Sequence, residues 1–291
     1  MVTDIDDTVK SSGGVNIFGI ALGGIDVQFK RGEFYPGVFQ FVLELSKGMN
    51  IAKNHMPEKV AVLTARAKEF KFALALKPKD KLCSAFREAG ERNGVRNWGI
   101  GPVYYGSVAE WILQNRKGIR KFANFERLLV EDGLCAGPGQ KKKYILVGDT
   151  GEKDEEAGER IIAKHGSKTI SAVFLHVVSN EKDRSRIVVP KDRVLNGVPI
   201  YYFRTYVGAA EKAMQNNLIT QDGLMRVIKA ARTDLQKKEP FSPALVVASS
   251  STYLPRASSS KWRELEEDAR SAIEAKDSKW RLSFKVSRTL G

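Results

Sequence analysis

Cysteine and histidine are scarce in this 291-residue chain. The two cysteines, Cys83 and Cys135, belong to no CxxC motif or Cys/His cluster, which argues against a zinc site. One disulfide between them is the alternative, but we expect two buried free thiols in a reducing compartment. The three histidines, His55, His165 and His176, are scattered along the chain, so we expect structural or surface roles for them.

Long apolar runs are missing as well. No run reaches the roughly 20 residues that a membrane-spanning helix needs. The N-terminal residues, Met1 to Asp7, have neither a charged region nor an apolar stretch of the signal-peptide type. We therefore expect a soluble, cytoplasmic protein, and peripheral contact with a membrane surface remains open.

Acidic residues are outnumbered. The chain has 48 Lys and Arg against 34 Asp and Glu, for a formal net charge of +14. This excess favours anionic partners such as phosphate esters, acidic lipid headgroups or nucleic acid. No interleaved basic and aromatic motif accompanies the charge, so nucleic acid is not an expected partner. The run from Gly137 to Lys143 is no P-loop, because its spacing differs and no Ser or Thr follows the lysine.

Hydrophobic residues make up 42% of the chain, enough for a sizeable core. Strand-like apolar runs alternate with helical patterns, which predicts a doubly wound α/β domain with a parallel sheet covered on both faces. In such sheets, functional residues collect at the carboxyl ends of the strands. The expected strands are 60–64, 144–149, 169–176 and 199–203, and the expected helices are 36–46, 67–76, 108–130 with a break near Gly118, and 153–164.

Two segments depart from this alternation. Residues 10–35 are rich in glycine, and we interpret them as a small flap over the strand ends, or alternatively as an ordinary glycine-rich loop. After residue 205, helical patterns at 207–216 and 221–235 predict a helical extension over 206–239. We expect residues 1–239 to form one domain, and 240–291 to be a serine-rich linker and a loosely attached tail. On one face of the tail's expected helix lie Trp262, Leu265, Ala269, Ala272 and Ile273.

The first motif with chemical potential is Asp4-Ile5-Asp6-Asp7-Thr8, at the end of an expected first strand. A carboxylate can attack phosphorus and form an aspartyl-phosphate. A second carboxylate two residues later can protonate the leaving alkoxide and then activate water. On an extended segment, Asp4 and Asp6 point the same way and can reach one substrate.

Two further elements can support phosphoryl transfer. Thr64 ends an expected strand, where its hydroxyl either binds phosphoryl oxygens or caps the helix expected from Ala67. A lysine is also needed to neutralise the nucleophile and the phosphate. Lys117 and Lys121 are the candidates, both on an expected helix.

Two acids follow the strand 144–149. Asp149 and Asp154 flank a glycine turn in the segment Gly148 to Asp154. Hard oxygen ligands on a loop suit Mg²⁺, which keeps several waters and bridges to substrate phosphate. An exposed acidic turn is the alternative, but the apolar strand before these acids places them at the functional edge.

In this order, the DxDxT motif, the threonine, the lysine and the GDx₄D segment resemble the haloacid dehalogenase (HAD) superfamily. More narrowly, DIDDTVK, LTAR and GDTGEKDEE resemble the catalytic domain of the App1-like (actin patch protein 1) phosphatidate phosphatases. The segments Tyr105 to Trp111 and Arg120 to Phe122 add to the similarity, which covers about residues 1–205.

The resemblance implies a role for each matching residue. Asp4 would be the nucleophile and a Mg²⁺ ligand, and Asp6 the acid/base, with its carbonyl also on the metal. Thr64 would bind phosphate. Lys121 is favoured over Lys117, because an apolar helix follows it. Asp149 would be the second metal ligand, and Asp154 would support the metal site.

The resemblance also implies a substrate, phosphatidate, which would be hydrolysed to diacylglycerol and phosphate. A soluble or protein phosphomonoester is an alternative, as is a non-catalytic membrane or cytoskeletal adaptor that keeps the fold. An anionic membrane surface would be a partner, reached through basic residues expected on the face that opens onto Asp4. These residues are Lys30, Arg31, Arg116, Lys117, Arg120, Lys141, Lys142 and Lys143.

One departure from the family concerns the first strand, which normally carries several apolar residues before the DxDxT motif. Here only Met1, Val2 and Thr3 precede Asp4. We therefore expect a short central strand: either the gene model is truncated, or the strand forms poorly and lowers the activity.

Overall fold

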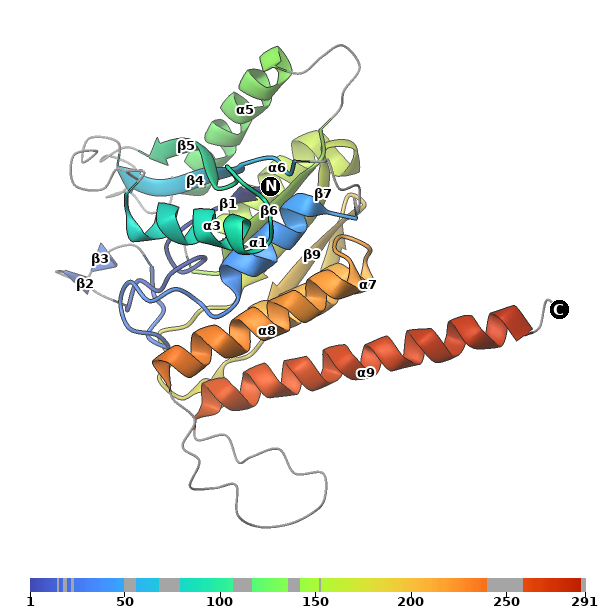
Figure 1. Cartoon of the computed structure of the whole chain (residues 1–291). Coiled ribbons are helices and arrows are strands. Elements are labelled where there is room, and N and C mark those ends of the chain that lie inside the picture. Colours follow the sequence, from blue (N-terminus) through green and yellow to red (C-terminus); the bar gives the residue numbers. More distant parts are fainter. Residues whose placement is uncertain are drawn as a thin grey trace.

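A computed structural model describes the chain over residues 1–14, 16–17, 20–21, 24–49, 56–67, 79–106, 117–135, 142–151, 153–239 and 259–288. Within these ranges, side chains are not described for 16–17, 20–21, 65–67, 117, 134–135 and 275–288. Figure 1 shows an α/β fold in which helices surround a central sheet.

The sheet has seven strands in the order β5-β4-β1-β6-β7-β9-β8. The strands are β1 (Val2–Thr3), β4 (Val60–Ala67), β5 (Ile100–Gly106), β6 (Tyr144–Asp149), β7 (Ile170–His176), β8 (Arg193–Leu195) and β9 (Val198–Phe203). All neighbouring strands are parallel except β8, which pairs antiparallel with β9. The prediction of a mostly parallel α/β sheet is therefore confirmed.

The shortest of these strands, β1, lies inside the sheet between β4 and β6. β1 has two residues, yet it pairs with β4 on one side and β6 on the other. Backbone hydrogen bonds from Ala61 N to Met1 O and from Asp4 N to Val147 O, each 3.1 Å, extend both ladders. Val2 and Thr3 are buried, and the strand is as short as predicted; the expectation that it forms poorly is wrong, because it is paired on both sides.

Successive residues of the central strands point to opposite faces of the sheet. In β4, Val60 and Val62 join one core, and Ala61 and Leu63 join the other. The strands are apolar on both sides because helices cover both faces.

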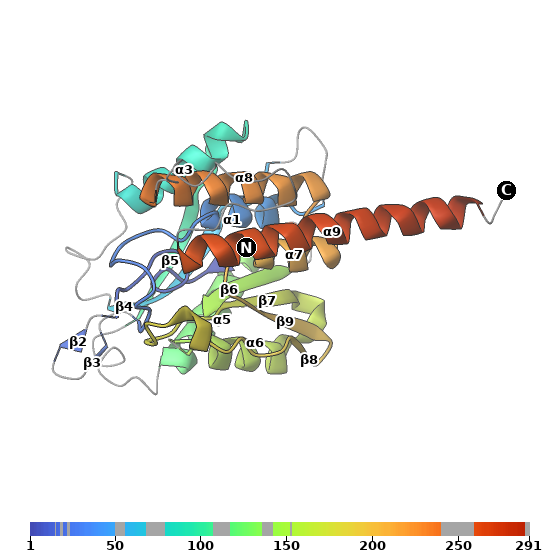
Figure 2. The ribbon, with the colours of Figure 1, turned by 90° about the horizontal axis from the view of Figure 1, so that it is seen from below.

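Two helical layers enclose the sheet, as Figure 2 shows. One layer consists of α5 (Lys117–Cys135) and α6 (Asp154–Thr169). The other contains α1 (Val38–Lys47), α3 (Lys81–Arg92), α7 (Tyr206–Gln215), α8 (Gln221–Lys238) and α9 (Ser260–Arg288). In the described part of the chain, no helix combines the length and hydropathy needed to cross a bilayer.

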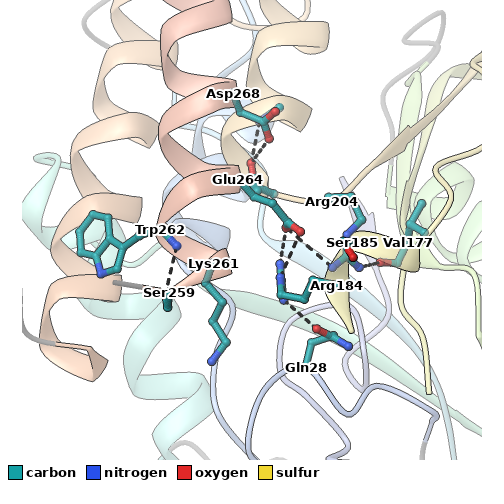
Figure 3. Close-up of polar contacts among 12 residues, drawn as sticks. Gln28, Val177, Arg184, Ser185, Arg204, Ser259, Lys261, Trp262, Glu264 and Asp268 are labelled. Atoms are coloured by element: carbon teal, nitrogen blue, oxygen red, sulfur yellow. Dashed lines mark hydrogen bonds and ion pairs between the residues drawn. The ribbon is translucent and has the colours of Figure 1, made fainter. Parts of the chain in front are cut away.

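The final helix, α9, is more firmly attached than we expected. Trp262, Leu265, Ala269 and Ala272 are buried in the same core as α7 and α8. Ion pairs add to this packing: Glu264 lies between Arg184 and Arg204, and Arg184 also donates to Gln28 Oε1 at 3.3 Å (Figure 3). The second half of α9 then runs on past the body of the molecule (Figure 1).

Several elements differ from the prediction. β4 continues to Ala67, so Ala67 does not begin a helix, and most of the expected helix 67–76 lies outside the described residues. α5 begins at Lys117, so Gly118 lies in its first turn; residues 108–116 are outside the description, and the expected break near Gly118 stays a prediction. The structure also contains α3 and β5, which we did not predict.

The glycine-rich insertion 10–35 contains a hairpin, as the flap interpretation requires. Its two strands, β2 (Asn16–Ile17) and β3 (Ile20–Ala21), pair antiparallel. The segment that returns from the hairpin is tied to the loop after β7, because Val27 N donates to Ser179 O at 3.1 Å. The insertion is therefore anchored at the carboxyl edge of the sheet.

Candidate active site

The site begins with two neighbouring strand ends. Asp4 directly follows β1, and Asp149 is the last residue of β6. β1 and β6 are adjacent and parallel, with Thr3 opposite Val147. The register thus brings Asp4 and Asp149 to the same edge, where both side chains are buried.

Asp154 joins them from the first turn of α6. The chain reaches this helix through Lys153, whose φ of 69° is left-handed. Gly148 permits the close approach, since a Cβ there would lie 2.5 Å from Asp154 Cβ. Asp4, Asp149 and Asp154 each offer a carboxylate oxygen, and these atoms lie within 4.8 Å of one another. The expected convergence of the three acids is therefore observed.

Lys121 extends into this acidic group from α5. Its side chain is 3% exposed, and Nζ lies 3.0 Å from Asp4 Oδ2 and 2.5 Å from Asp154 Oδ1. The ammonium offsets negative charge that would be costly to bury alone. Lys121 points towards Asp4 as we expected, while the side chain of Lys117 lies outside the described residues.

Thr64 and Asp6 occupy less central positions. Thr64 is buried within β4 rather than at its end, because the strand continues to Ala67. A role as the cap of a helix from Ala67 is therefore excluded, and its role in phosphate binding stays a prediction. The Asp6 carboxylate is 3.8 Å from Lys10 Nζ and, among the described residues, is not part of the three-acid group.

The oxygen atoms of the three acids are not equivalent. Asp154 uses Oδ1 for Lys121 and Oδ2 for the backbone N–H of Asp149, at 3.1 Å. Asp149 accepts the Gly151 N–H at 2.6 Å and the Thr8 hydroxyl at 3.3 Å. Carboxylate oxygens in this arrangement fit Mg²⁺, which prefers hard oxygen donors.

Two buried side chains that the sequence analysis had not placed at the site, His176 and Tyr206, hydrogen-bond to the backbone of the DxDxT loop. His176 Nδ1 lies 2.8 Å from Asp7 O, and the Tyr206 hydroxyl donates to Thr8 O. Burial lowers the pKa of His176 to about 4, so the imidazole is neutral and its Nδ1–H donates to the Asp7 carbonyl. The polar His176 at the end of an apolar strand was the available sequence signal.

Asp7 itself is fully buried beside this pair. Burial raises the pKa of Asp7 to about 7, while backbone hydrogen bonds from Ser12 and Asp26 act in the opposite direction. Its position in the motif is evident from the sequence, but its partners are not.

The proposed basic membrane face is only partly supported. Lys30 and Arg31 are exposed on the insertion. Lys142 and Lys143 precede β6 and so lie at its amino end, opposite Asp149; Lys142 pairs with Glu58 at 3.2 Å and Asp132 at 3.5 Å. Including Lys142 and Lys143 on the Asp4 face was therefore wrong. Arg120 is half-buried, and Arg116, Lys141 and the Lys117 side chain are outside the described residues.

The remaining predictions for cysteine and histidine have mixed outcomes. Cys83 is a free thiol but is half-buried rather than buried, and the side chain of Cys135 is outside the description. His165 pairs with Glu126 near the surface, and His55 is not described.

Comparisons with protein-family models, with curated proteins and with solved structures each found no match to this chain.

Proposed function

We propose that this chain is a Mg²⁺-dependent phosphatase of the HAD type that forms an aspartyl-phosphate on Asp4. The observation that supports this most is the ion pair between the buried Lys121 ammonium and Asp4, beside Asp149 and Asp154 at one sheet edge. A nucleophilic carboxylate needs nearby positive charge, because both it and its phosphate substrate are anionic.

The reaction would proceed in two displacements. The Asp4 carboxylate attacks phosphorus, the ester P–O bond breaks, and Asp6 gives its proton to the leaving alkoxide. Asp6 then takes a proton from water, which attacks the aspartyl-phosphate and regenerates Asp4 with release of phosphate. Asp6 is half-buried and two residues from Asp4, which suits a proton carrier that must meet water.

The other residues would hold charge and orientation. Asp4, the carbonyl of Asp6 and Asp149 would hold Mg²⁺, which offsets charge on the nucleophile and the phosphoryl group. Asp154 fixes both the Lys121 ammonium and the Asp149 backbone. Thr64 would donate its hydroxyl to a phosphoryl oxygen.

For the substrate we propose phosphatidate, hydrolysed to diacylglycerol and phosphate at an anionic membrane surface. The App1-like motifs and the net charge of +14 support this choice. Exposed Lys30 and Arg31 on the insertion, which is anchored at the catalytic edge, would attract anionic lipid. A soluble or protein phosphomonoester remains the second candidate, since the same charges would attract it.

The experiment is a measurement of phosphate release from phosphatidate vesicles and from a panel of soluble phosphomonoesters, with Mg²⁺ and with a chelator. We expect Mg²⁺-dependent release, fastest with phosphatidate. Faster release from a soluble ester would change the substrate and keep the mechanism. No release from any substrate would favour the non-catalytic adaptor.

A further inference from the structure

The side chain of Asp7 links the catalytic loop to both sides of the flap hairpin, to Ser12 before β2 and to Ile25 and Asp26 after β3. Its Oδ1 accepts the N–H of Ser12 at 2.7 Å, where the insertion leaves the loop. Its Oδ2 accepts the N–H groups of Ile25 at 2.6 Å and Asp26 at 2.9 Å, where the insertion returns. Hydrogen bonds to a carboxylate are stronger than those between neutral groups. The Asp7 side chain therefore holds Ser12 close to Ile25 and Asp26.

The backbone is shaped to allow this contact. Asp7 has a left-handed φ of 57°, and Gly24 has a φ of 128°. A Cβ at position 24 would lie only 2.0 Å from Asp7 Oδ2, so a side chain there would displace the carboxylate. Glycine adopts such a φ without a steric cost, and Asp tolerates the left-handed region better than most residues, so the local sequence allows the close approach of Asp7 to Gly24.

From Asp7 the contacts continue to the metal-binding loop. Ile25, held by its N–H on Asp7, lies against Gly151, where a Cβ would be 2.9 Å from Ile25 Cγ1. The Gly151 N–H in turn donates to Asp149 Oδ1 at 2.6 Å. Ile25 of the flap thus packs close to Gly151, the residue whose backbone N–H binds an expected metal ligand.

We infer that Asp7 is a positioning residue, which couples the base of the flap to the orientation of Asp149 and so to metal binding. The inference rests on the proposed function for the identity of the metal. The coupling between Asp7, Ile25 and Gly151 does not depend on catalysis and can be measured separately.

Two substitutions separate the carboxylate from the backbone. Asp7→Asn keeps the shape of the side chain but replaces one carboxylate oxygen with an NH₂ group. That group donates hydrogen bonds, so it cannot accept those of the facing backbone N–H groups. Asp7→Gly keeps the left-handed φ at no steric cost and removes the side chain. Asp268→Asn is the matched control, because it changes a partly buried acid outside the flap, whose side chain accepts a hydrogen bond from Thr205 beside α9.

The first measurement is the affinity for magnesium chloride, by calorimetric titration of the full chain. Outer partners of metal ligands typically contribute about 10–100-fold in affinity, so we expect both Asp7 variants to lose affinity in that range. Asp268→Asn should bind Mg²⁺ like the wild type. Folded Asp7 variants with wild-type affinity would overturn the inference.

The second measurement is amide hydrogen exchange, which also works if an Asp7 variant folds poorly. In the wild type, Mg²⁺ should slow exchange at Ile25 and Asp26 as well as at Gly151, since coupling is reciprocal. Protection of Gly151 alone would contradict the coupling. If the wild type binds no Mg²⁺, the proposed metal site is wrong. The coupling is then tested by whether Asp7→Asn speeds amide exchange at Gly151. Unchanged exchange at Gly151 would overturn the coupling.

Discussion

At the scale of single residues, the charge balance around Lys121 determines both stability and reactivity. Its ammonium is buried between Asp4 and Asp154, so removing it would leave two carboxylates without their shared cation. Breaking a buried ion pair by removing one partner typically costs about 3–5 kcal/mol.

We therefore predict that Lys121→Met lowers the free energy of unfolding by about 3–5 kcal/mol in metal-free buffer, measured by urea denaturation. Lys164→Met is the control, because the Lys164 side chain is 55% exposed and its ion pair with Glu126 lies at the surface. Exposed pairs contribute about 0–1 kcal/mol. Equal losses in the two variants would contradict the proposed charge balance.

The same argument predicts a specific effect of metal. A divalent cation can replace part of the missing positive charge, so Mg²⁺ should raise the melting temperature of Lys121→Met more than that of the wild type. Thermal unfolding with and without Mg²⁺ tests this. An equal or smaller rise in the melting temperature of the variant would show that Mg²⁺ does not bind beside Asp4 and Asp154.

The candidate residues were predictable from the sequence because their motifs sit where strands end. Asp4, Asp149, Asp154 and Lys121 could be named from local pattern and order alone. The partners of Asp7 could not, because Ile25 and Asp26 lie 18 and 19 residues further along the chain and reach Asp7 only when the insertion folds back. The role of Thr64 as a helix cap failed because β4 is longer than its apolar run.

At the scale of elements, the N-terminal half of α9 is locked onto the N-terminus of α7. Thr205 is the N-cap of α7, and its hydroxyl bonds Asp268 of α9 at 2.5 Å. Burial raises the pKa of Asp268 to about 6, with further contributions from Glu211, Glu264 and Glu267. The folded protein therefore holds a proton on Asp268 more tightly than the unfolded chain does.

The consequence is a loss of stability as pH rises through about 4 to 6, because ionising Asp268 costs more in the folded state. Asp268→Asn cannot ionise and should lack this loss. We predict that the stability of the wild type relative to this variant falls by about 2–3 kcal/mol across that range, measured by chemical denaturation at several pH values. If the free energies of unfolding of the wild type and Asp268→Asn change with pH in parallel, the raised pKa of Asp268 is contradicted.

Element prediction succeeded where apolar residues were continuous. β6, β7 and β9 match their predicted ranges within one residue at each end, because buried parallel strands are apolar on both faces. β5 was missed because Gly101 and Pro102 interrupt its pattern. α3 was missed although Leu82, Phe86 and Ala89 follow helical spacing, because charged residues lie between them.

At the scale of the whole molecule, the surplus of positive charge is divided between opposite edges of the sheet. Lys30 and Arg31 lie on the insertion at the carboxyl edge, while Lys59 and Lys143 directly precede β4 and β6 at the amino edge. All four side chains are exposed. The pair Lys30 and Arg31 therefore differs from the pair Lys59 and Lys143 mainly in its distance from Asp4.

We predict that the protein binds anionic vesicles, and that binding weakens as salt rises. Each basic residue near such a surface contributes about 1 kcal/mol, so Lys30→Gln with Arg31→Gln should weaken binding about 30-fold in vesicle co-sedimentation. The control pair, Lys59→Gln with Lys143→Gln, should have little effect. Equal losses in both pairs, or equal binding to neutral vesicles, would exclude docking through the catalytic edge.

The central claim is that Asp4 carries the phosphoryl group during turnover. The most direct measurement is to mix the protein with Mg²⁺ and a phosphomonoester, quench with borohydride, and locate the modified residue by peptide mass spectrometry. Borohydride reduces an acyl-phosphate to an alcohol, so the account predicts homoserine at position 4 and its absence without substrate. Phosphate release with no modification of Asp4, or modification at another carboxylate, would contradict it.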